Sequence, residues 1–119
     1  MMTPKEKREK KSAISAVIDL GNGRFKDHEV DTLYDLATRR DEYNGRSYTR
    51  KGSSNGWYSD GKYTRNYETT YTIRNDESGM RIDEHYEYHD DDGQTGSSDW
   101  SYRTGREILN NLDKVLRWR

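Results

Sequence analysis

The chain of 119 residues contains no cysteine, a single proline and a single phenylalanine. Without cysteine it can form neither disulfides nor thiolate metal sites, and it has no thiol nucleophile; a cytoplasmic protein is expected. No apolar run approaches the roughly 18 residues of a membrane span. The basic start lacks the apolar segment of a signal peptide, so we expect no membrane partner.

Aliphatic side chains are also scarce. Leu, Ile, Val and Phe together number 15 of the 119 residues, a proportion typical of disordered chains when the net charge is high. The formal net charge is only -1, because 21 cations nearly balance 22 anions. Ten tyrosines and three tryptophans supply large apolar surfaces with polar tips. The composition predicts a single small folded domain over residues 1–119, with a thin core.

The first helix is predicted from a capping box. Thr3 and Glu6 have the required spacing, and Pro4 occupies the first helical position, where its missing N–H costs nothing. An apolar stripe follows, and Gly21 is expected to end the helix. Residues 1–12 form a basic start that we expect to be solvated and frayed.

Two further helices are predicted. One begins at Asp27 and ends before Gly45, with apolar residues at helical spacing. The other follows a second capping box formed by Thr104 and Glu107. Its apolar stripe is Ile108, Leu109, Leu112, Val115 and Leu116. This C-terminal amphipathic helix should cover one face of a sheet.

Between the helices, alternation of Tyr, Thr and Arg from Arg46 onward predicts an antiparallel sheet. A central hairpin is expected in which Arg74 pairs with Gly79 across a four-residue loop. That register places Tyr71 opposite Ile82 and Tyr67 opposite Tyr86. Further short strands are predicted at 47–50, 57–59 and 99–102, around a flexible 51–56. The fold class is therefore α+β, with two N-terminal helices, three or four antiparallel strands and a closing helix.

Charge is segregated along the chain, and residues 75–99 alone carry a net charge of -8. An acidic run interleaved with tyrosines spans 83–92. Its candidate partner-binding residues are Asp83, Glu84, Tyr86, Glu87, Tyr88, Asp90, Asp91 and Asp92. Carboxylates in such an array present the same sign of charge as phosphates, so they can dock on a basic surface. The alternative is a solvated strand guarded by charge against aggregation.

In size, lack of cysteine, charge density and the acidic run at 83–92, the chain resembles small inhibitors encoded by phages and mobile elements, such as anti-CRISPR proteins. The resemblance implies a non-enzymatic inhibitor of a host-defence complex, needing no cofactor. Its partner would be a larger protein or ribonucleoprotein with a basic, nucleic-acid-binding surface. A core this poor in aliphatic side chains also makes a homodimer plausible.

A nucleic-acid-binding accessory or regulatory protein is the alternative function, because cations and tyrosines can contact phosphates and stack on bases. The residues concerned are Lys7, Arg8, Lys10, Lys11, Arg46, Arg50, Lys51 and Arg65. The sequence pI of about 6.3 argues against this function, since nonspecific nucleic-acid binders are usually basic overall.

Catalytic motifs are missing from the sequence, and we predict that the protein is not an enzyme. There is no nucleophile elbow, no phosphate-binding loop with lysine and no zinc-protease motif. One enzymatic hypothesis is a metal-dependent hydrolase built on His85, Glu87 and His89, which share one side of a predicted strand. The alternative is a polar strand face, and we predict no metal site.

Overall fold

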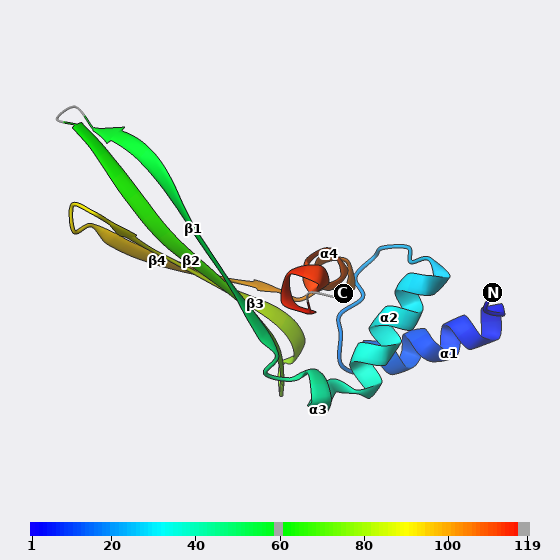
Figure 1. Ribbon diagram of the computed structural model, residues 1–119. Coiled ribbons are helices and arrows are strands. Elements are labelled where there is room, and N and C mark those ends of the chain that lie inside the picture. Colours follow the sequence, from blue (N-terminus) through cyan, green and yellow to red (C-terminus); the bar gives the residue numbers. More distant parts are fainter. Residues whose placement is uncertain (59–60, 117–119) are drawn as a thin grey trace.

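The computed structural model describes residues 1–58 and 61–116. Helices α1 (Pro4–Ser15), α2 (Asp27–Thr38) and α3 (Arg40–Tyr43) precede strands β1 (Ser47–Tyr58), β2 (Gly61–Asp76), β3 (Gly79–Asp90) and β4 (Thr95–Tyr102), and helix α4 (Gly105–Leu116) follows. The strands form one antiparallel sheet in the order β1-β2-β3-β4 (Figure 1). The predicted α+β class is confirmed, with four strands.

Helix α1 lies against α2. The Thr3 hydroxyl caps α1 by accepting a backbone N–H, as predicted. Lys7 lies 3.3 Å from Asp27, and Lys10 lies 2.7 Å from Asp31. The basic start of the chain, for which we expected fraying, is thus helical and joined to α2 by two ion pairs.

The first helix ends well before Gly21, so its predicted length is wrong. The Val17 carbonyl accepts the N–H of Met80, at the start of β3, at 2.8 Å. Two residues later, the Asp19 carbonyl accepts the N–H of Gly105, at the start of α4, at 2.7 Å. These backbone groups are satisfied by distant partners instead of by another helical turn, which explains why local helix signals overestimated α1.

The β2–β3 hairpin is confirmed, but its predicted register is wrong. Gly79 pairs with Asp76 around a two-residue turn, and not with Arg74, so Ile82 faces Ile73. The Asp76 carboxylate accepts the N–H of the second turn residue at 2.9 Å. Gly79 has a φ of 101°, a conformation that glycine adopts without strain. Because the register shifts by an even number of residues, every side chain keeps its predicted face.

Both edge strands are longer than predicted. Strand β1 pairs with β2 without interruption. Residues 47–50 and 57–58 are strand as predicted, but they belong to one strand, so the flexible segment predicted at 51–56 is wrong; Ser59 lies outside the described residues. Strand β4 begins at Thr95. Gly52 and Gly56, which indicated flexibility, pair with Tyr67 and Tyr63 of β2.

The aliphatic core lies where the helices meet the sheet. Helix α4, preceded by the predicted Thr104–Glu107 capping box, packs Ile108 and Leu112 against one face of β2 and β3, including Ile73. We call this the helix face. It comprises the odd-numbered residues of β2 and the even-numbered residues of β3 and of both edge strands. The opposite side is the outer face.

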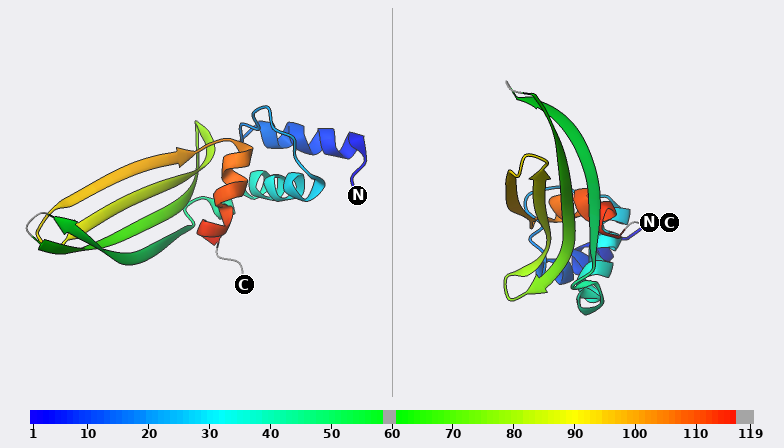
Figure 2. Two further views of the ribbon diagram at one scale, coloured as in Figure 1. Left: turned by 90° about the horizontal axis from the view of Figure 1, so that it is seen from above. Right: turned by 60° about the vertical axis from the view of Figure 1, so that its left-hand side comes forward.

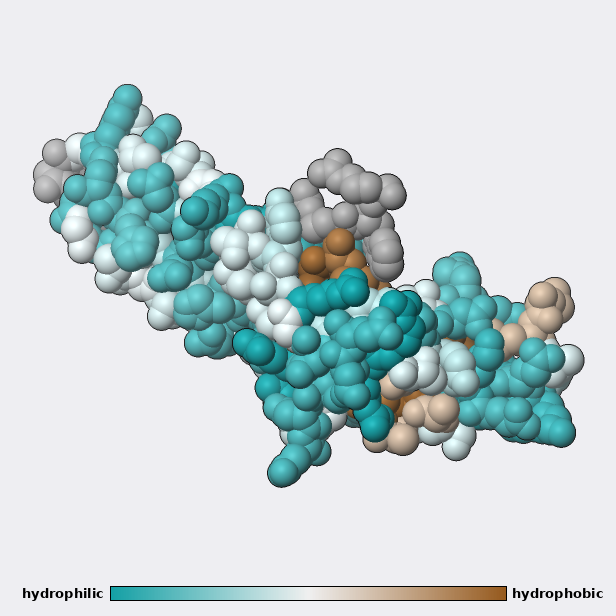
Figure 3. Space-filling model, turned by 60° about the horizontal axis from the view of Figure 1, so that its bottom comes forward, coloured by the Kyte–Doolittle hydropathy of each residue, from teal (hydrophilic) through white to brown (hydrophobic). Residues whose placement is uncertain are grey.

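The far part of the sheet projects beyond the helices. All four helices gather at one end in Figures 1 and 2, and the molecule measures 64 × 29 × 26 Å. In Figure 3 the apolar residues in view lie at the helical end, whereas the projecting sheet is coloured as polar or neutral. We call the part beyond Tyr71 and Glu84 the distal sheet. No helix of the described chain covers its helix face (Figure 2).

Candidate partner-binding site

Strand alternation divides the acidic run between different surfaces. Strand register places Glu84, Tyr86, Tyr88 and Asp90 on the helix face. Asp83 and Glu87 therefore lie on the outer face. Asp91 and Asp92 are exposed in the β3–β4 turn. The run is thus not one continuous acidic patch.

Asp90 is occupied within the molecule. Its side chain is fully buried, and its two oxygens accept the Nε and Nη2 hydrogens of Arg65 at 2.8 and 3.0 Å. This bidentate ion pair consists of two strong, charge-assisted hydrogen bonds. The Arg65 hydrogen bond lowers the pKa of Asp90 below its ordinary value. Asp90 therefore acts as an internal partner of Arg65, and it is not available to a ligand.

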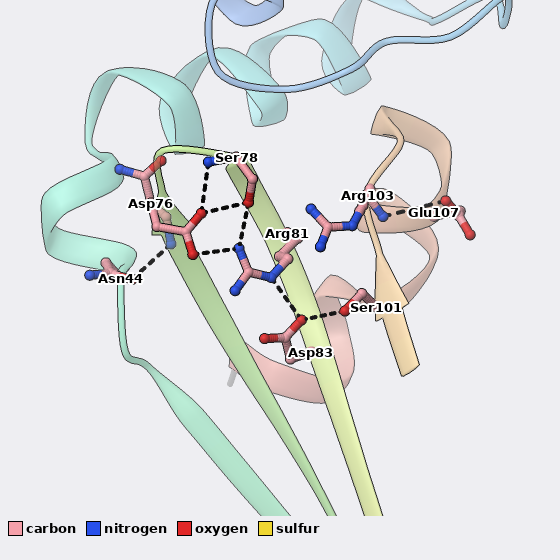
Figure 4. A network of polar contacts seen from close by, with 9 residues as sticks. Asn44, Asp76, Ser78, Arg81, Asp83, Ser101, Arg103 and Glu107 are labelled. Carbon is pink, nitrogen blue, oxygen red and sulfur yellow. Dashed lines mark hydrogen bonds and ion pairs between the residues drawn. The ribbon is translucent and has the colours of Figure 1, made fainter. Parts of the chain in front are cut away.

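Asp83 is likewise engaged on the outer face (Figure 4). It accepts hydrogen bonds from Arg81 at 3.0 Å and from Ser101 of β4 at 2.7 Å. Arg81 also reaches Asp76 in the β2–β3 turn at 2.8 Å. The Ser78 hydroxyl, and then Arg81, lower the pKa of Asp76 to about 2. This network fixes the turn and joins β3 to β4.

Glu84 differs from Asp83 and Asp90 because it has no cationic partner among the described residues. One carboxylate oxygen accepts the Tyr102 hydroxyl at 3.1 Å. Burial, together with this bond, raises the pKa of Tyr102 to about 12. Burial and the Glu84 charge also raise the pKa of Tyr71. Two phenols thus adjoin a carboxylate that forms no ion pair within the described residues, while Lys114 of α4 lies on the Tyr71 ring, 5.4 Å from its centroid.

Three tyrosines of the distal sheet lie over glycines on neighbouring strands. Tyr63 and Tyr67 pair with Gly56 and Gly52 of β1, and Tyr88 pairs with Gly96 of β4. A Cβ added to Gly52, Gly56 or Gly96 would come within 2.6, 2.2 or 2.4 Å of the tyrosine ring or hydroxyl. Only glycine leaves room for these rings, an arrangement that fixes register and covers the glycine backbone.

A fourth ring completes this surface. Tyr86 lies between Tyr67 and Tyr88, with ring centroids 6.2 and 6.1 Å apart and interplanar angles of 33° and 41°. The Arg65 guanidinium stacks on Tyr88 at 3.9 Å and lies 5.6 Å from Tyr63. All four tyrosines are half-buried. We call these four rings, with Arg65, the tyrosine platform.

The basic residues of the alternative function are widely separated. Lys7 and Lys10 pair with α2, while Arg8 is exposed and Lys11 half-buried on α1. Arg46, ahead of β1, lies 4.9 Å from the ring of Tyr43. Strand alternation assigns Arg50 and Arg65 to the helix face, whereas Lys51 lies on the outer face and pairs with Glu68 at 3.3 Å. The structure does not bring these residues together.

His85, Glu87 and His89 share the outer face, as predicted. The Glu87 carboxylate lies 3.9 Å from each imidazole, and His85 Nδ1 contacts Asp99 Oδ1 at 2.6 Å. This hydrogen bond raises the pKa of His85. Within residues 1–58 and 61–116, no group of three such side chains is arranged to hold a metal ion.

Charge is unequal across the sheet. Strands β1 and β2 carry five cationic and two acidic side chains, whereas the segment 79–102 carries seven acidic side chains and one cationic. These acidic side chains are divided between the two faces: Glu84 and the paired Asp90 lie on the helix face, and Asp91 and Asp92 lie in the β3–β4 turn. We call Glu84, Asp91 and Asp92 the acidic margin of the platform. Sequence reasoning found Tyr86 and Tyr88 but missed Trp100, a 61% exposed side chain of β4, and it missed the glycines beneath the platform.

No protein-family model, curated protein or solved structure matches this chain. Of the helices in the described residues, none has the length and apolar character needed to cross a bilayer.

Proposed function

We propose that the protein is a small, non-enzymatic binding protein of the cytoplasm, which uses the tyrosine platform to occupy a surface of a larger protein. The observation that carries this proposal is the set of half-buried tyrosine rings on a part of the sheet that no described helix covers. A sheet face ordinarily buries its apolar side chains against a second layer. Here a partner would supply that layer.

The platform has the chemistry of a protein-binding hot spot. Tyrosine and arginine are enriched in such sites, because they combine large apolar area with hydrogen-bonding groups. Tyr63, Tyr67 and Tyr88 pack closely over glycines of the neighbouring strands, so these rings would lose less side-chain freedom on binding than solvated ones. The platform is therefore preorganised for docking.

The acidic margin favours a basic partner. Glu84, Asp91 and Asp92, which are not ion-paired within the described residues, would attract a positively charged surface and accelerate encounter at low salt. A nucleic-acid-binding surface of a host-defence complex has this charge, so an inhibitor of the anti-CRISPR type fits the proposal. The acidic residues then act as a margin that steers association, and the platform provides the contact area.

Nucleic-acid binding is a second candidate, which the exposed aromatic rings favour because bases stack on such surfaces. The charge of the sheet opposes it. Arg65, the cation within the platform, is paired with Asp90, and the β3–β4 margin would repel phosphates. We therefore favour a protein partner.

The experiment is affinity capture from a lysate of the native host, with bound protein and bound nucleic acid quantified in parallel. The test variant combines Tyr67→Ala and Tyr86→Ala; the control is Trp57→Ala, which removes a 74% exposed ring from the outer face of β1. We expect the platform variant to lose its protein partner at least about tenfold, and the control to retain it. Equal capture by the two variants, or capture of nucleic acid alone, would contradict the proposal.

A further inference from the structure

On the helix face, one cation, Arg65, is bound by both a carboxylate and an aromatic ring of the same molecule. The Asp90 carboxylate holds Arg65 by two hydrogen bonds, and the guanidinium lies 3.9 Å from the centroid of Tyr88. Carboxylate, cation and aromatic ring thus form one unit. The carboxylate neutralises the charge while the ring interacts with the flat face of the guanidinium.

Six residues earlier on β3, Glu84 also lies among aromatic side chains, but it forms no ion pair with a described cation. Lys114 of α4 lies over the Tyr71 ring, 5.4 Å from its centroid. The residues directly across from it are Tyr71 on β2 and Trp100 on β4, and Tyr86 is the next residue of β3 on the same face. The position that Arg65 fills opposite Asp90 is taken here by Tyr71. The Tyr102 hydroxyl therefore orients the Glu84 carboxylate, which forms no ion pair with a described cation.

We propose that Glu84, Tyr86 and Trp100 form a binding site for a cationic side chain of the partner, arginine above all. This inference rests on the proposed function and names the chemistry of the partner. Trp100 offers the strongest cation–π surface of any side chain, and 61% of it is exposed. A half-buried carboxylate gains most from a charge-assisted hydrogen bond to a planar guanidinium.

The position of this Glu84 site indicates how the partner reaches it. The sheet order makes β4 an edge strand, so Trp100 stands at the margin where a polypeptide can approach from the side. An extended segment can lie along such an edge and place alternate side chains over the sheet. Because residues 79–102 are strongly acidic, a segment bearing several arginines is complementary in charge.

The test uses a fluorescein-labelled hexa-arginine peptide as the probe, with binding followed by fluorescence anisotropy at low and moderate salt. The test variants are Glu84→Gln and Trp100→Ala, and glutamine at 84 can still accept the Tyr102 hydrogen bond. The matched control is Glu68→Gln. It removes the same charge from the middle of the sheet, but strand alternation places Glu68 on the outer face. Circular dichroism checks that each variant is folded.

We expect each test variant to weaken probe binding roughly tenfold, as loss of a charge-assisted or cation–π contact predicts, and the control to stay within about twofold. A hexalysine probe should bind less tightly, because lysine lacks the planar fork. Equal weakening by Glu84→Gln and Glu68→Gln, or no saturable binding of hexa-arginine, would overturn the inference. So would binding of oligothymidylate that the same two variants abolish.

Failure of this inference can be distinguished from failure of the proposed function. If the probe does not bind but the Tyr67→Ala, Tyr86→Ala variant still loses the captured protein, the platform docks a partner and the Glu84 site is not its cation site. If capture also survives in that variant, the proposed function fails.

Discussion

The helical end and the distal sheet of this molecule are stabilised by different kinds of side chain. Around α4 the buried residues are mostly aliphatic, including Leu33, Ile82 and Ile108, and they are almost completely shielded from solvent. On the distal sheet the corresponding layer consists of half-buried tyrosines over glycines, with the Arg65–Asp90 ion pair between them. The helical end buries its apolar surface within the molecule, whereas the distal sheet leaves part of its apolar surface accessible.

This difference explains how a chain with so few aliphatic residues builds a sheet that extends far beyond its core. A tyrosine laid over a glycine covers backbone and apolar surface without requiring a second layer. The tyrosine hydroxyl and the outer ring surface stay accessible to solvent. An aliphatic side chain in the same place would expose only apolar surface, at a cost in free energy. Stability is thus concentrated at the helical end, and the distal sheet keeps a surface suited to binding.

The largest effect should follow from Ile82→Ala, in the helical end. Ile82 is 1% exposed, so truncation leaves a cavity and should lower the free energy of unfolding by about 2–5 kcal/mol. Tyr86→Ala, four residues further along the same face of β3, should cost less, about 1 kcal/mol, because its ring is half-buried. Urea denaturation measures both. A larger loss for Tyr86→Ala would show that the distal sheet, and not the helical end, dominates stability.

Asp90→Asn should give the next largest effect. The substitution leaves the Arg65 charge against Tyr88 without its carboxylate, and removing one partner of a buried pair is costly. The lowered pKa of Asp90 means that its contribution is present above the unfolded pKa, about 3.9. The contribution is lost as pH falls through the folded pKa.

The stability difference between wild type and Asp90→Asn should therefore shrink on acidification, which thermal denaturation at a series of pH values below 5 can measure. Asp91→Asn, one residue later in the exposed turn, is the control. An equal effect of both substitutions would mean that the Arg65–Asp90 pair adds nothing to the distal sheet.

The extent to which these features follow from the sequence depends on how local their signals are. The Thr3 and Thr104 caps are decided by residues three positions apart, and both were predicted. The Arg65–Asp90 pair requires the register of a whole hairpin. In the predicted register Arg65 faces Tyr88, and only the shift by two residues places it opposite Asp90.

The glycines beneath the tyrosine platform also depend on strand register for their interpretation. Gly52 and Gly56 indicated flexibility when considered alone, so the middle of β1 was missed although both of its ends were predicted. Their spacing matches that of Tyr67 and Tyr63 in reverse order, a signal visible only once β1 and β2 are aligned. The acidic run shows a different failure: strand alternation alone divides it between two faces, yet we expected its carboxylates to act as one array.

Gly52→Ala tests whether the tyrosine–glycine pairs support the distal sheet. The new Cβ would lie 2.6 Å from the Tyr67 hydroxyl, so the ring must shift. We expect a loss of about 1 kcal/mol in the free energy of unfolding and changed chemical shifts for Tyr67. Ser54→Ala, between the two glycines on the same face, is the matched control. If both substitutions are neutral, the close fit of ring and glycine does not stabilise the sheet.

The smallest effect concerns the outer face, where His85 and Asp99 join β3 to β4. Their hydrogen bond raises the pKa of His85, so the folded state favours the imidazolium. The stability this provides is present below the unfolded pKa of about 6.5 and is lost as pH rises through the higher folded pKa. Asp99→Asn should return the NMR-measured pKa of His85 toward 6.5 and remove this pH dependence.

Because both side chains are exposed, water and salt screen the pair, and the change in the free energy of unfolding should be smaller than that of Gly52→Ala. An unchanged His85 titration in Asp99→Asn would show that the outer face contributes no pH-dependent contact, leaving the helix face as the source of order in the distal sheet.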